Sequence, residues 1–345
     1  MRAVLFDDFG AEPRIADVPA PSCTPSGVVI RVRASGLCRS DWHAWMGHDA
    51  DVRVPHVPGH ELAGVIEQAG DAVTGFAPGD RVTVPFICAC GTCAQCVDGQ
   101  QQVCDRQQQP GFTQWGSFAE LVSIPEADTN LVALPDDLDF VSAAALGCRF
   151  ATAYRAVVNQ GRVRAGEWVS VHGCGGVGLS AIMIAAAAGA RVVAVDVSTD
   201  ALGVAQRLGA VPVRASAAGD VASAVREATD GGAHLSIDAY GSAATCENSV
   251  RSLRKRGRHV QVGLMLGADA MASLPMDLVV AHELEILGSH GMAAHEYPQM
   301  LAAIAAGRID PRPLVGRRIT LAEAPGALAA MTVGTHPGTT VIELP

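Results

Sequence analysis

Four cysteines lie close together in the segment CGTCAQCVDGQQQVC, which covers residues 90–104. Their spacing is C-x2-C-x2-C-x7-C, and the four residues are Cys90, Cys93, Cys96 and Cys104. Four thiolates in so short a segment can surround one zinc ion as a tetrahedron, and four protein ligands leave no open position for a substrate. We therefore predict a structural zinc site. Free thiols and an iron–sulfur cluster are the alternatives, because thiolates also bind iron.

Three further residues of metal-binding types are dispersed over the first 150 positions. Cys38 occurs in GLCRSDWH, His60 in PGHELAG and Cys148 in LGCRFATAY. A catalytic zinc ion needs three protein ligands and one open position, and two cysteines with one histidine form a known set. Each residue alone is more often a buried structural side chain. Together, in a chain that also has a dinucleotide-binding segment, they predict a catalytic zinc site.

The dinucleotide-binding segment is VSVHGCGGVGLSA, residues 169–181, which places a glycine-rich turn between a strand and a helix. Gly173 allows the tight turn, Gly175 lets the backbone approach a pyrophosphate, and Gly178 lets the helix pack closely on the strand. The free N–H groups at the start of such a helix bind phosphates. The alternative is a glycine turn without a ligand. The predicted cofactor-binding residues of the turn are Gly173, Gly175, Gly176, Val177 and Gly178.

Asp196 ends the apolar run RVVAVD, eighteen residues beyond Gly178. A carboxylate at this place binds the 2′-hydroxyl of the adenosine ribose, and its charge repels the 2′-phosphate of NADP. We therefore predict that NAD is the cofactor.

The elements that position these residues fall into three stretches, which predict a two-domain α/β protein. Residues 1–150 are rich in Pro and Gly and contain alternating runs such as VVIRVRASG and DRVTVPF, which predict a mostly antiparallel β domain with a zinc lobe at about residues 88–105. Residues 151–289 alternate short apolar strands with Ala-rich helices, which indicates a doubly wound parallel sheet. Residues 290–345 contain one helix, EYPQMLAAIAAG, and a final strand, TTVIEL, which we expect to return to the first domain.

The composition disfavours membrane-spanning and nucleic-acid-binding proteins. The chain has 345 residues, of which 49% are hydrophobic, and a formal net charge of −10. The acidic balance disfavours nucleic acids and anionic membranes as partners. No apolar run is long enough to span a bilayer, and the first residues, MRAVLFDDFG, lack the apolar run of a signal peptide. We expect a cytoplasmic protein, in which ten cysteines favour metal binding or catalysis over disulfides.

The whole sequence resembles the zinc-dependent medium-chain alcohol dehydrogenases. GHELAGVIEQAGDAV, residues 59–73, matches the family signature GHE-x2-G-x5-G-x2-V. The four-cysteine lobe, the GxGGVG loop and the stretch CRSDWH match as well. The resemblance implies a GroES-like catalytic domain, a Rossmann domain and a cleft between them. It also implies reversible hydride transfer between an alcohol and NAD, with zinc as the Lewis acid on the alcohol oxygen.

The resemblance assigns roles to residues near the predicted catalytic zinc. Glu61 is similar to the acidic neighbour that transiently approaches the metal, and Asp41 to the carboxylate that orients the ligand histidine. Ser40 would take the proton of the alcohol, and His43 would pass it to water through the cofactor ribose; a capping serine and a surface histidine are the alternatives. Arg39 is expected to contact the pyrophosphate.

The substrate is not indicated by any motif. Large side chains that could line a substrate pocket, or belong to the core instead, are Trp42, Trp45, Phe86, Trp115 and His290. Three rival functions remain: a zinc-ribbon binding module, a catalytically silent relative, and an enzyme of the same fold that holds NAD(H) permanently. The resemblance to the shorter bacterial members favours a homo-oligomer, and among oligomers a tetramer.

Overall fold

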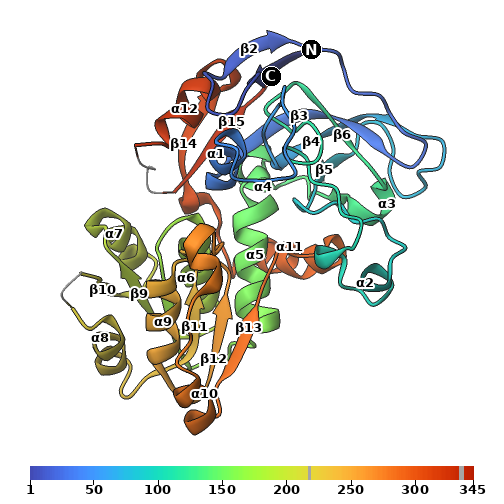
Figure 1. Ribbon diagram of the computed structural model, residues 1–345. Helices are drawn as coiled ribbons and strands as arrows, with labels where there is room; N and C mark the ends of the chain where they lie inside the picture. The colour runs from blue at the N-terminus through green and yellow to red at the C-terminus, as the bar shows by residue number, and fades with distance from the viewer. Residues whose placement is uncertain (217–218, 334–337) are drawn as a thin grey trace. The chain divides into compact units, whose positions relative to one another are not determined.

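The computed structural model describes residues 1–216, 219–333 and 338–345 (Figure 1). The described chain divides into two compact units. The first unit comprises Met1–Ala151, Gly291–Ala302 and Pro311–Pro345, and the second comprises Thr152–His290 and Ala303–Asp310. The sequence assigned all of residues 290–345 to the first domain. The difference at Ala303–Asp310 arises because one continuous helix, α11 (Tyr297–Ala305), runs across the division.

The first unit is built on a seven-stranded sheet with the order β14-β15-β3-β4-β5-β7, in which β6 also pairs with β3. All of these pairs are antiparallel except β14 with β15. The strands are β3 (Val28–Leu37), β4 (Glu61–Ala69), β5 (Arg81–Thr83), β6 (Leu121–Ile124), β7 (Val132–Ala133), β14 (Val315–Thr320) and β15 (Thr339–Glu343). A separate pair is formed by β1 (Arg2–Leu5) and β2 (Arg14–Asp17). The predicted antiparallel domain is confirmed, although β5 is shorter than the run DRVTVPF because Pro85 cannot donate to a ladder.

Short helices connect the strands of the first unit. They are α1 (Arg39–Trp45), α2 (Ala94–Val97), α3 (Ala127–Asn130), α4 (Phe140–Ala144) and α12 (Ala324–Ala330), with α11 described above. A π-helical turn, Leu146–Phe150, follows α4 and leads through α5 (Ala151–Tyr154) into a second π-helical turn, Arg155–Gln160. π-helical turns are uncommon and often occur at functional sites. The first of them contains Cys148.

The second unit is a six-stranded parallel sheet with the order β10-β9-β8-β11-β12-β13. Its strands are β8 (Trp168–His172), β9 (Arg191–Asp196), β10 (Val211–Arg214), β11 (Ala233–Asp238), β12 (Leu253–Gln261) and β13 (Glu285–Gly288). Its helices are α6 (Gly176–Ala187), α7 (Thr199–Arg207), α8 (Val221–Ala228), α9 (Ala243–Arg251) and α10 (Met276–His282). The strand order runs outward in both directions from β8, so the predicted doubly wound sheet is confirmed. In such sheets ligands bind at the carboxyl ends of the strands where the order reverses.

Each unit has its own apolar core. In the first unit the largest fully buried side chains include Phe6, Ile30, Leu62 and Phe118. In the second, Val193 and Val225 belong to one cluster of buried side chains and Val250 to another. Among the described residues, no helix has both the length and the apolar character needed to cross a membrane.

Candidate active site

One buried carboxylate organises the region where β3 ends. Cys38 is the N-cap of α1, and its backbone N–H donates to Oδ2 of Asp41 at 2.8 Å. Oδ1 of Asp41 accepts the N–H of Gly59 at 3.1 Å and Nδ1 of His60 at 2.8 Å. The Asp41 side chain has no exposed surface. Because it accepts the proton on Nδ1, it leaves Nε2 of His60 with a lone pair available for a metal.

Four potential ligand groups, including His60 itself, converge here. Cys38, His60, Glu61 and Cys148 each offer one ligand atom, and these atoms lie within 4.8 Å of one another. Nε2 of His60 is buried and has no hydrogen-bond partner. A buried nitrogen without a partner, next to two thiols, fits the donor set of a catalytic zinc ion. The structure therefore brings together the three residues that the sequence proposed as ligands.

The electrostatics of this group agree with metal binding. Burial lowers the pKa of His60, but the charge and hydrogen bond of Asp41 outweigh burial and raise the pKa well above its usual value. A more basic imidazole is a stronger ligand. A hydrogen bond between the two thiols lowers the pKa of Cys38 and raises that of Cys148, and the positive charge of Arg149 also lowers the pKa of Cys38. One thiolate is thus favoured in this pair, in which Cys38 is buried and Cys148 is half-buried.

Arg149 is a member of this site that the sequence did not indicate. Its Nε donates to Oε1 of Glu61 at 2.9 Å, its backbone N–H donates to the same oxygen at 3.1 Å, and its Nη2 donates to Oε2. Burial raises the pKa of Glu61, and the Arg149 charge opposes that rise. A buried glutamate needs a cation, so the position of Arg149 directly after Cys148 was the available signal.

The four-cysteine lobe forms a second group of ligands. Its four sulfur atoms also lie within 4.8 Å of one another, and Cys93, Cys96 and Cys104 are buried. The backbone N–H of Cys90 and that of Arg106 each donate to Sγ of Cys104 at 3.3 Å, which offsets negative charge on the sulfurs. The arrangement fits a structural zinc ion. None of the ten cysteines, all of which are described, forms a disulfide.

The glycine loop of the second unit leads from β8 into α6. Gly173 has φ +93°, and a Cβ there would lie 2.8 Å from Cβ of Tyr240. A Cβ on Gly178 would lie 1.8 Å from the carbonyl oxygen of Gly173. In contrast, a Cβ on Gly175 would meet no atom within 4 Å. Packing therefore explains the glycines at 173 and 178, whereas Gly175 keeps free a space that a dinucleotide can approach closely.

Asp196 lies at the end of β9 and holds the glycine loop. Its Oδ2 accepts the backbone N–H of Cys174 at 2.6 Å, and its Oδ1 accepts that of Ser198 at 2.8 Å. Its contact with a ribose stays a prediction.

Comparisons with known proteins show the family of this chain. Residues 24–136 match the family described as the alcohol dehydrogenase GroES-like domain, and residues 176–306 match the family described as zinc-binding dehydrogenase. An alcohol dehydrogenase of Geobacillus stearothermophilus is 34% identical over 311 residues, which is 90% of each chain. The chain belongs to the zinc-type alcohol dehydrogenase family.

Two further relatives cover nearly the whole chain. An NAD-dependent alcohol dehydrogenase of Sulfurisphaera tokodaii is 33% identical over 338 residues, which is 95% of each chain. The solved structure of an alcohol dehydrogenase from Thermus sp. ATN1 superposes with a TM-score of 0.92 at 31% identity over the full length of both chains. The family and the fold class predicted from the sequence are confirmed, and the protein is an oxidoreductase with two groups of ligands that fit zinc.

The residues assigned to proton transfer in this dehydrogenase lie on α1. Oγ of Ser40 is 3.8 Å from Sγ of Cys38, so the hydroxyl borders the metal-binding group. His43 is half-buried, and its Nδ1 lies 3.0 Å from Nδ1 of His48. Burial lowers the pKa of His43, and the charge of Arg39 lowers it further. Their roles stay predictions.

Arg39 is held within the first unit by two contacts. Its guanidinium donates to the carbonyl oxygen of Met331 and stacks on Trp42, with Cζ 3.7 Å from the ring centroid. The indole N–H of Trp42 donates to Oγ1 of Thr332 at 3.0 Å. The predicted contact of Arg39 with a pyrophosphate stays a prediction.

The remaining candidates for a substrate pocket lie in different places. The rings of Phe86 and Phe112 meet the His60 ring edge-on, with centroid distances of 6.2 Å and 5.2 Å. The sequence did not suggest Phe112. Trp115 donates to the carbonyl oxygen of Pro55 and packs with the cluster around β1. Two others remain: Trp45 is buried in the core of the first unit, and His290 is exposed in the second.

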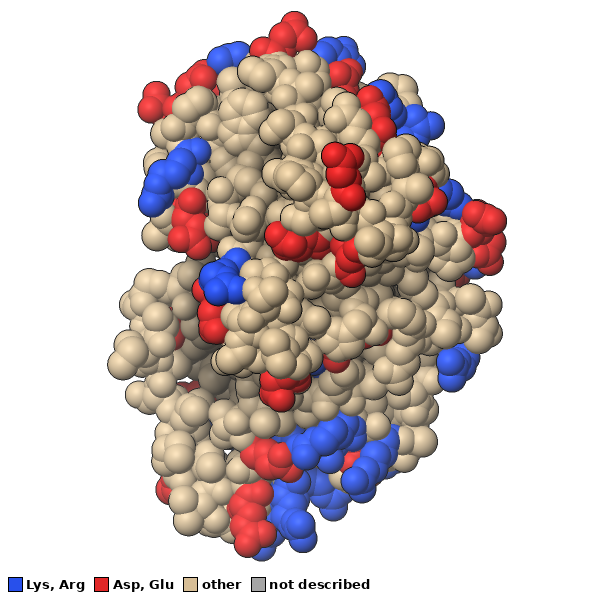
Figure 2. All heavy atoms as spheres, turned by 90° about the vertical axis from the view of Figure 1, so that its right-hand side faces the viewer, with Lys and Arg blue, Asp and Glu red and all other residues tan. Residues whose placement is uncertain are grey.

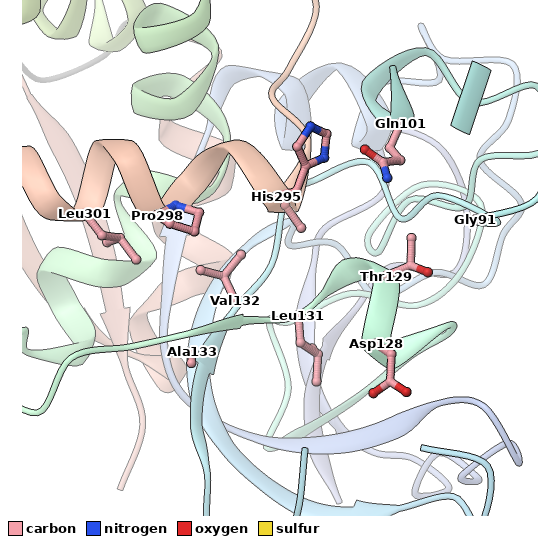
Figure 3. Close-up of a pocket in the computed structure, with 11 residues that line it drawn as sticks. Gly91, Gln101, Asp128, Thr129, Leu131, Val132, Ala133, His295, Pro298 and Leu301 are labelled. Atoms are coloured by element: carbon pink, nitrogen blue, oxygen red, sulfur yellow. The ribbon is translucent and has the colours of Figure 1, made fainter. Parts of the chain in front are cut away.

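A cavity of about 460 Å³ lies elsewhere in the first unit (Figure 3). Gly91 and Gln101 of the cysteine lobe, the segment around α3 and β7, and the start of α11 line it. Figure 3 shows the side chains of Gln101 and His295 directed toward each other across this space. None of the predicted zinc ligands is among the described residues that line this cavity. The cavity is therefore separate from the candidate zinc-binding group.

Proposed function

We propose that this protein is an NAD-dependent zinc alcohol dehydrogenase that interconverts an alcohol and its aldehyde or ketone. The observation that carries the proposal is the buried Nε2 of His60, which has no hydrogen-bond partner and belongs to a converging group with Cys38 and Cys148. The glycine loop, with its open space at Gly175, supports a dinucleotide as the second substrate. The NAD dependence of the relative from Sulfurisphaera tokodaii is consistent with this choice.

The chain itself supplies positioning and proton transfer. Bound zinc would act as a Lewis acid on the alcohol oxygen, and bound NAD would accept the hydride. Asp41 fixes the tautomer and direction of the ligand histidine. Arg149 compensates the charge of Glu61 inside the protein. Ser40, beside the sulfur of Cys38, takes the proton of the alcohol and passes it toward His43.

The first test is activity and metal content together. We expect NADH formation with some members of a panel of alcohols, and two zinc ions per chain. Cys38→Ala and Cys148→Ala should each remove activity and one zinc ion. Cys93→Ser should remove the other zinc ion and mainly lower the unfolding temperature, because structural zinc contributes directly to folding. Cys23→Ala, outside both groups, is the control. Fewer than two zinc ions in a fully active chain would contradict the proposal.

The same preparation distinguishes an exchangeable from a permanently held cofactor. Gel filtration followed by release of bound nucleotide would detect NAD(H) that stays with the protein. We expect none to remain, because an alcohol dehydrogenase of the proposed kind must exchange NAD for NADH in each turnover.

We further propose that the protein has no nucleic-acid partner. A pocket of the second unit is lined by Arg162, Arg164, Arg256 and Arg258, but also by Glu283 and Glu285. Arg162 pairs with Glu285, and Arg258 pairs with Glu167 at 2.6 Å. Figure 2 shows basic side chains gathered in the lower part of the face it displays, with acidic side chains at the margin of this group and between its members. Such interleaving differs from the continuous basic surface that nucleic-acid binding requires.

A cytoplasmic location and a homo-oligomer, with a tetramer favoured, complete the proposal. Ten free cysteines suit a reducing compartment. The oligomer rests on the resemblance to the shorter bacterial members of the family. Light scattering coupled to gel filtration would measure the mass of the assembly.

A further inference from the structure

His43 and His48 form a hydrogen-bonded pair of imidazoles at the end of α1. Their Nδ1 atoms are 3.0 Å apart. The helix ends at Trp45, and Gly47, with φ +73°, turns the chain so that the N–H of His48 donates to the carbonyl oxygen of His43 at 2.9 Å. The ring of Trp42 meets both imidazoles edge-on. Its centroid lies 5.0 Å from that of His43 and 5.4 Å from that of His48. The pair is therefore built by the local fold.

The pair continues a series of polar groups that leads outward from the metal-binding group. Cys38 is buried, Ser40 and His43 are half-buried, and His48 is exposed. Ser40 and His43 are three residues apart on one helix, so their side chains lie on the same face. His48 is thus the member of the series that meets water.

We propose that His48 is the outer carrier of the proton relay, which receives the proton from His43 and releases it to water. This inference rests on the proposed function. A proton enters at Nε2 of His43, the proton on Nδ1 of His43 moves to Nδ1 of His48, and His48 loses a proton from Nε2 to water. One proton enters the pair and one leaves, so no other reactant is consumed. Exchange with water then restores the starting tautomers.

The charges around the pair support movement in this direction. Burial lowers the pKa of His43, Arg39 and His48 lower it further, and Cys38 alone raises it. A proton therefore does not remain on His43 at neutral pH. Beyond His48 the chain continues through Asp49, which is half-buried, and Asp51, which is exposed.

The test compares two replacements of His48 that both remove proton transfer but keep different properties of the side chain. His48→Gln keeps a hydrogen-bond acceptor, and His48→Phe keeps a ring against Trp42, but neither carries a proton. We expect both variants to lower kcat/KM for alcohol oxidation at neutral pH, by up to about 10²-fold, the lower end of the effect of a positioned base. High pH or added imidazole buffer should restore the rate. His295→Gln, an exposed histidine of the first unit, should behave as wild type.

Two further measurements separate proton transfer from a structural role. The double variant His43→Gln/His48→Gln should be no slower than His43→Gln alone, because His48 acts only through His43. In stopped-flow experiments, an indicator dye should show proton release that lags behind NADH formation in the His48 variants and coincides with it in wild type. Zinc content, NADH affinity and unfolding temperature should stay unchanged.

Three results would overturn the inference. Wild-type rates in both His48 variants, with a slow His43→Gln, would show that His43 releases its proton by another path. A slow His48→Gln with a normal His48→Phe would show that the ring only packs against Trp42. A wild-type protein that oxidises no alcohol would instead contradict the proposed function, and the relay with it.

Discussion

Asp41 joins two segments that are about twenty residues apart in the chain. Its two oxygens accept three hydrogen bonds, from the N–H groups of Cys38 and Gly59 and from the imidazole of His60. A thiol and an imidazole are thereby held at one place by a group that does not itself need to contact the metal. Partners of this kind matter for metal affinity nearly as much as the ligands do.

Replacing Asp41 should therefore weaken zinc binding. Asp41→Asn keeps the shape, but its amide N–H₂ would face one of the N–H donors, and the charge that makes His60 basic is lost. We expect about 10- to 100-fold weaker binding of the catalytic zinc, measured by competition with a chelator. Asp49→Asn, in the loop after α1, is the control. Unchanged affinity in Asp41→Asn would show that the ligands alone set the site.

Arg149 and Glu61 form an ion pair inside the protein. The Glu61 side chain is fully buried and that of Arg149 is 11% exposed. Breaking a buried pair by removing one partner leaves an uncompensated charge and costs about 3–5 kcal/mol. We expect Arg149→Ala to destabilise the protein by this amount in urea unfolding. Arg2→Ala, which breaks a surface pair with Glu120, should cost at most about 1 kcal/mol. Equal losses of unfolding free energy in the two variants would show that the buried Arg149–Glu61 pair stabilises the protein no more than a surface pair does.

At the scale of elements, the turn after β8 and the end of β9 form one structure. Asp196 accepts the N–H of Cys174, so the carboxylate expected to select NAD also holds the glycine loop. We therefore expect a single residue at the end of a strand to affect both the choice of cofactor and the conformation of the loop predicted to receive its phosphates.

Asp196→Ala should change both properties. The preference for NAD over NADP should fall, because the repulsion of the 2′-phosphate is lost, and KM for NAD should rise because the loop loses its hydrogen bond. Initial rates with each nucleotide would measure kcat/KM. Asp200→Ala, exposed in the first turn of α7, should leave the preference unchanged. A wild-type enzyme that used NADP more efficiently than NAD would contradict the role of Asp196.

The sequence indicated the elements and the candidate ligands better than the contacts between distant residues. The types and flanking motifs of Cys38, His60 and Cys148 sufficed to propose them as ligands, and the structure brings them together. The alternation of strands and helices indicated the parallel sheet. The sequence did not indicate the importance of Arg149, Phe112 or His48, because it depends on which side chains the fold places beside them. The continuation of α11 across two units had no local signal either.

At the scale of the whole molecule, buried histidines link stability to pH. His172 is 1% exposed in the second unit, where its Nε2 lies 3.5 Å from the hydroxyl of Ser252. Burial, and to a smaller extent the nearby His259, lower the pKa of His172 to about 3. Its ordinary value is 6.5. Between these two values the unfolded chain binds a proton that the folded chain does not.

Stability should therefore rise with pH through this window and fall on acidification. The loss from His172 alone is about 2 kcal/mol between pH 7 and pH 5, at about 1.4 kcal/mol per pH unit below 6.5. His172→Gln should flatten this dependence. Hydrogen exchange of the amides in β8, β11 and β12 at several pH values would measure it, with His295→Gln as the control. An equally steep dependence in His172→Gln would assign the proton uptake to other groups.

The pairing of β3 with β15 has a consequence for synthesis on the ribosome. β3 (Val28–Leu37) is among the first strands to emerge from the exit tunnel, yet its neighbour β15 (Thr339–Glu343) is among the last. The strands of the second unit all emerge between them, so that unit can fold while the first is still incomplete. Until β15 emerges, one edge of β3 has no partner from β15, and an unpaired strand edge invites association with other chains. The strand that leads into the proposed zinc-binding group is thus among the last to be fully paired.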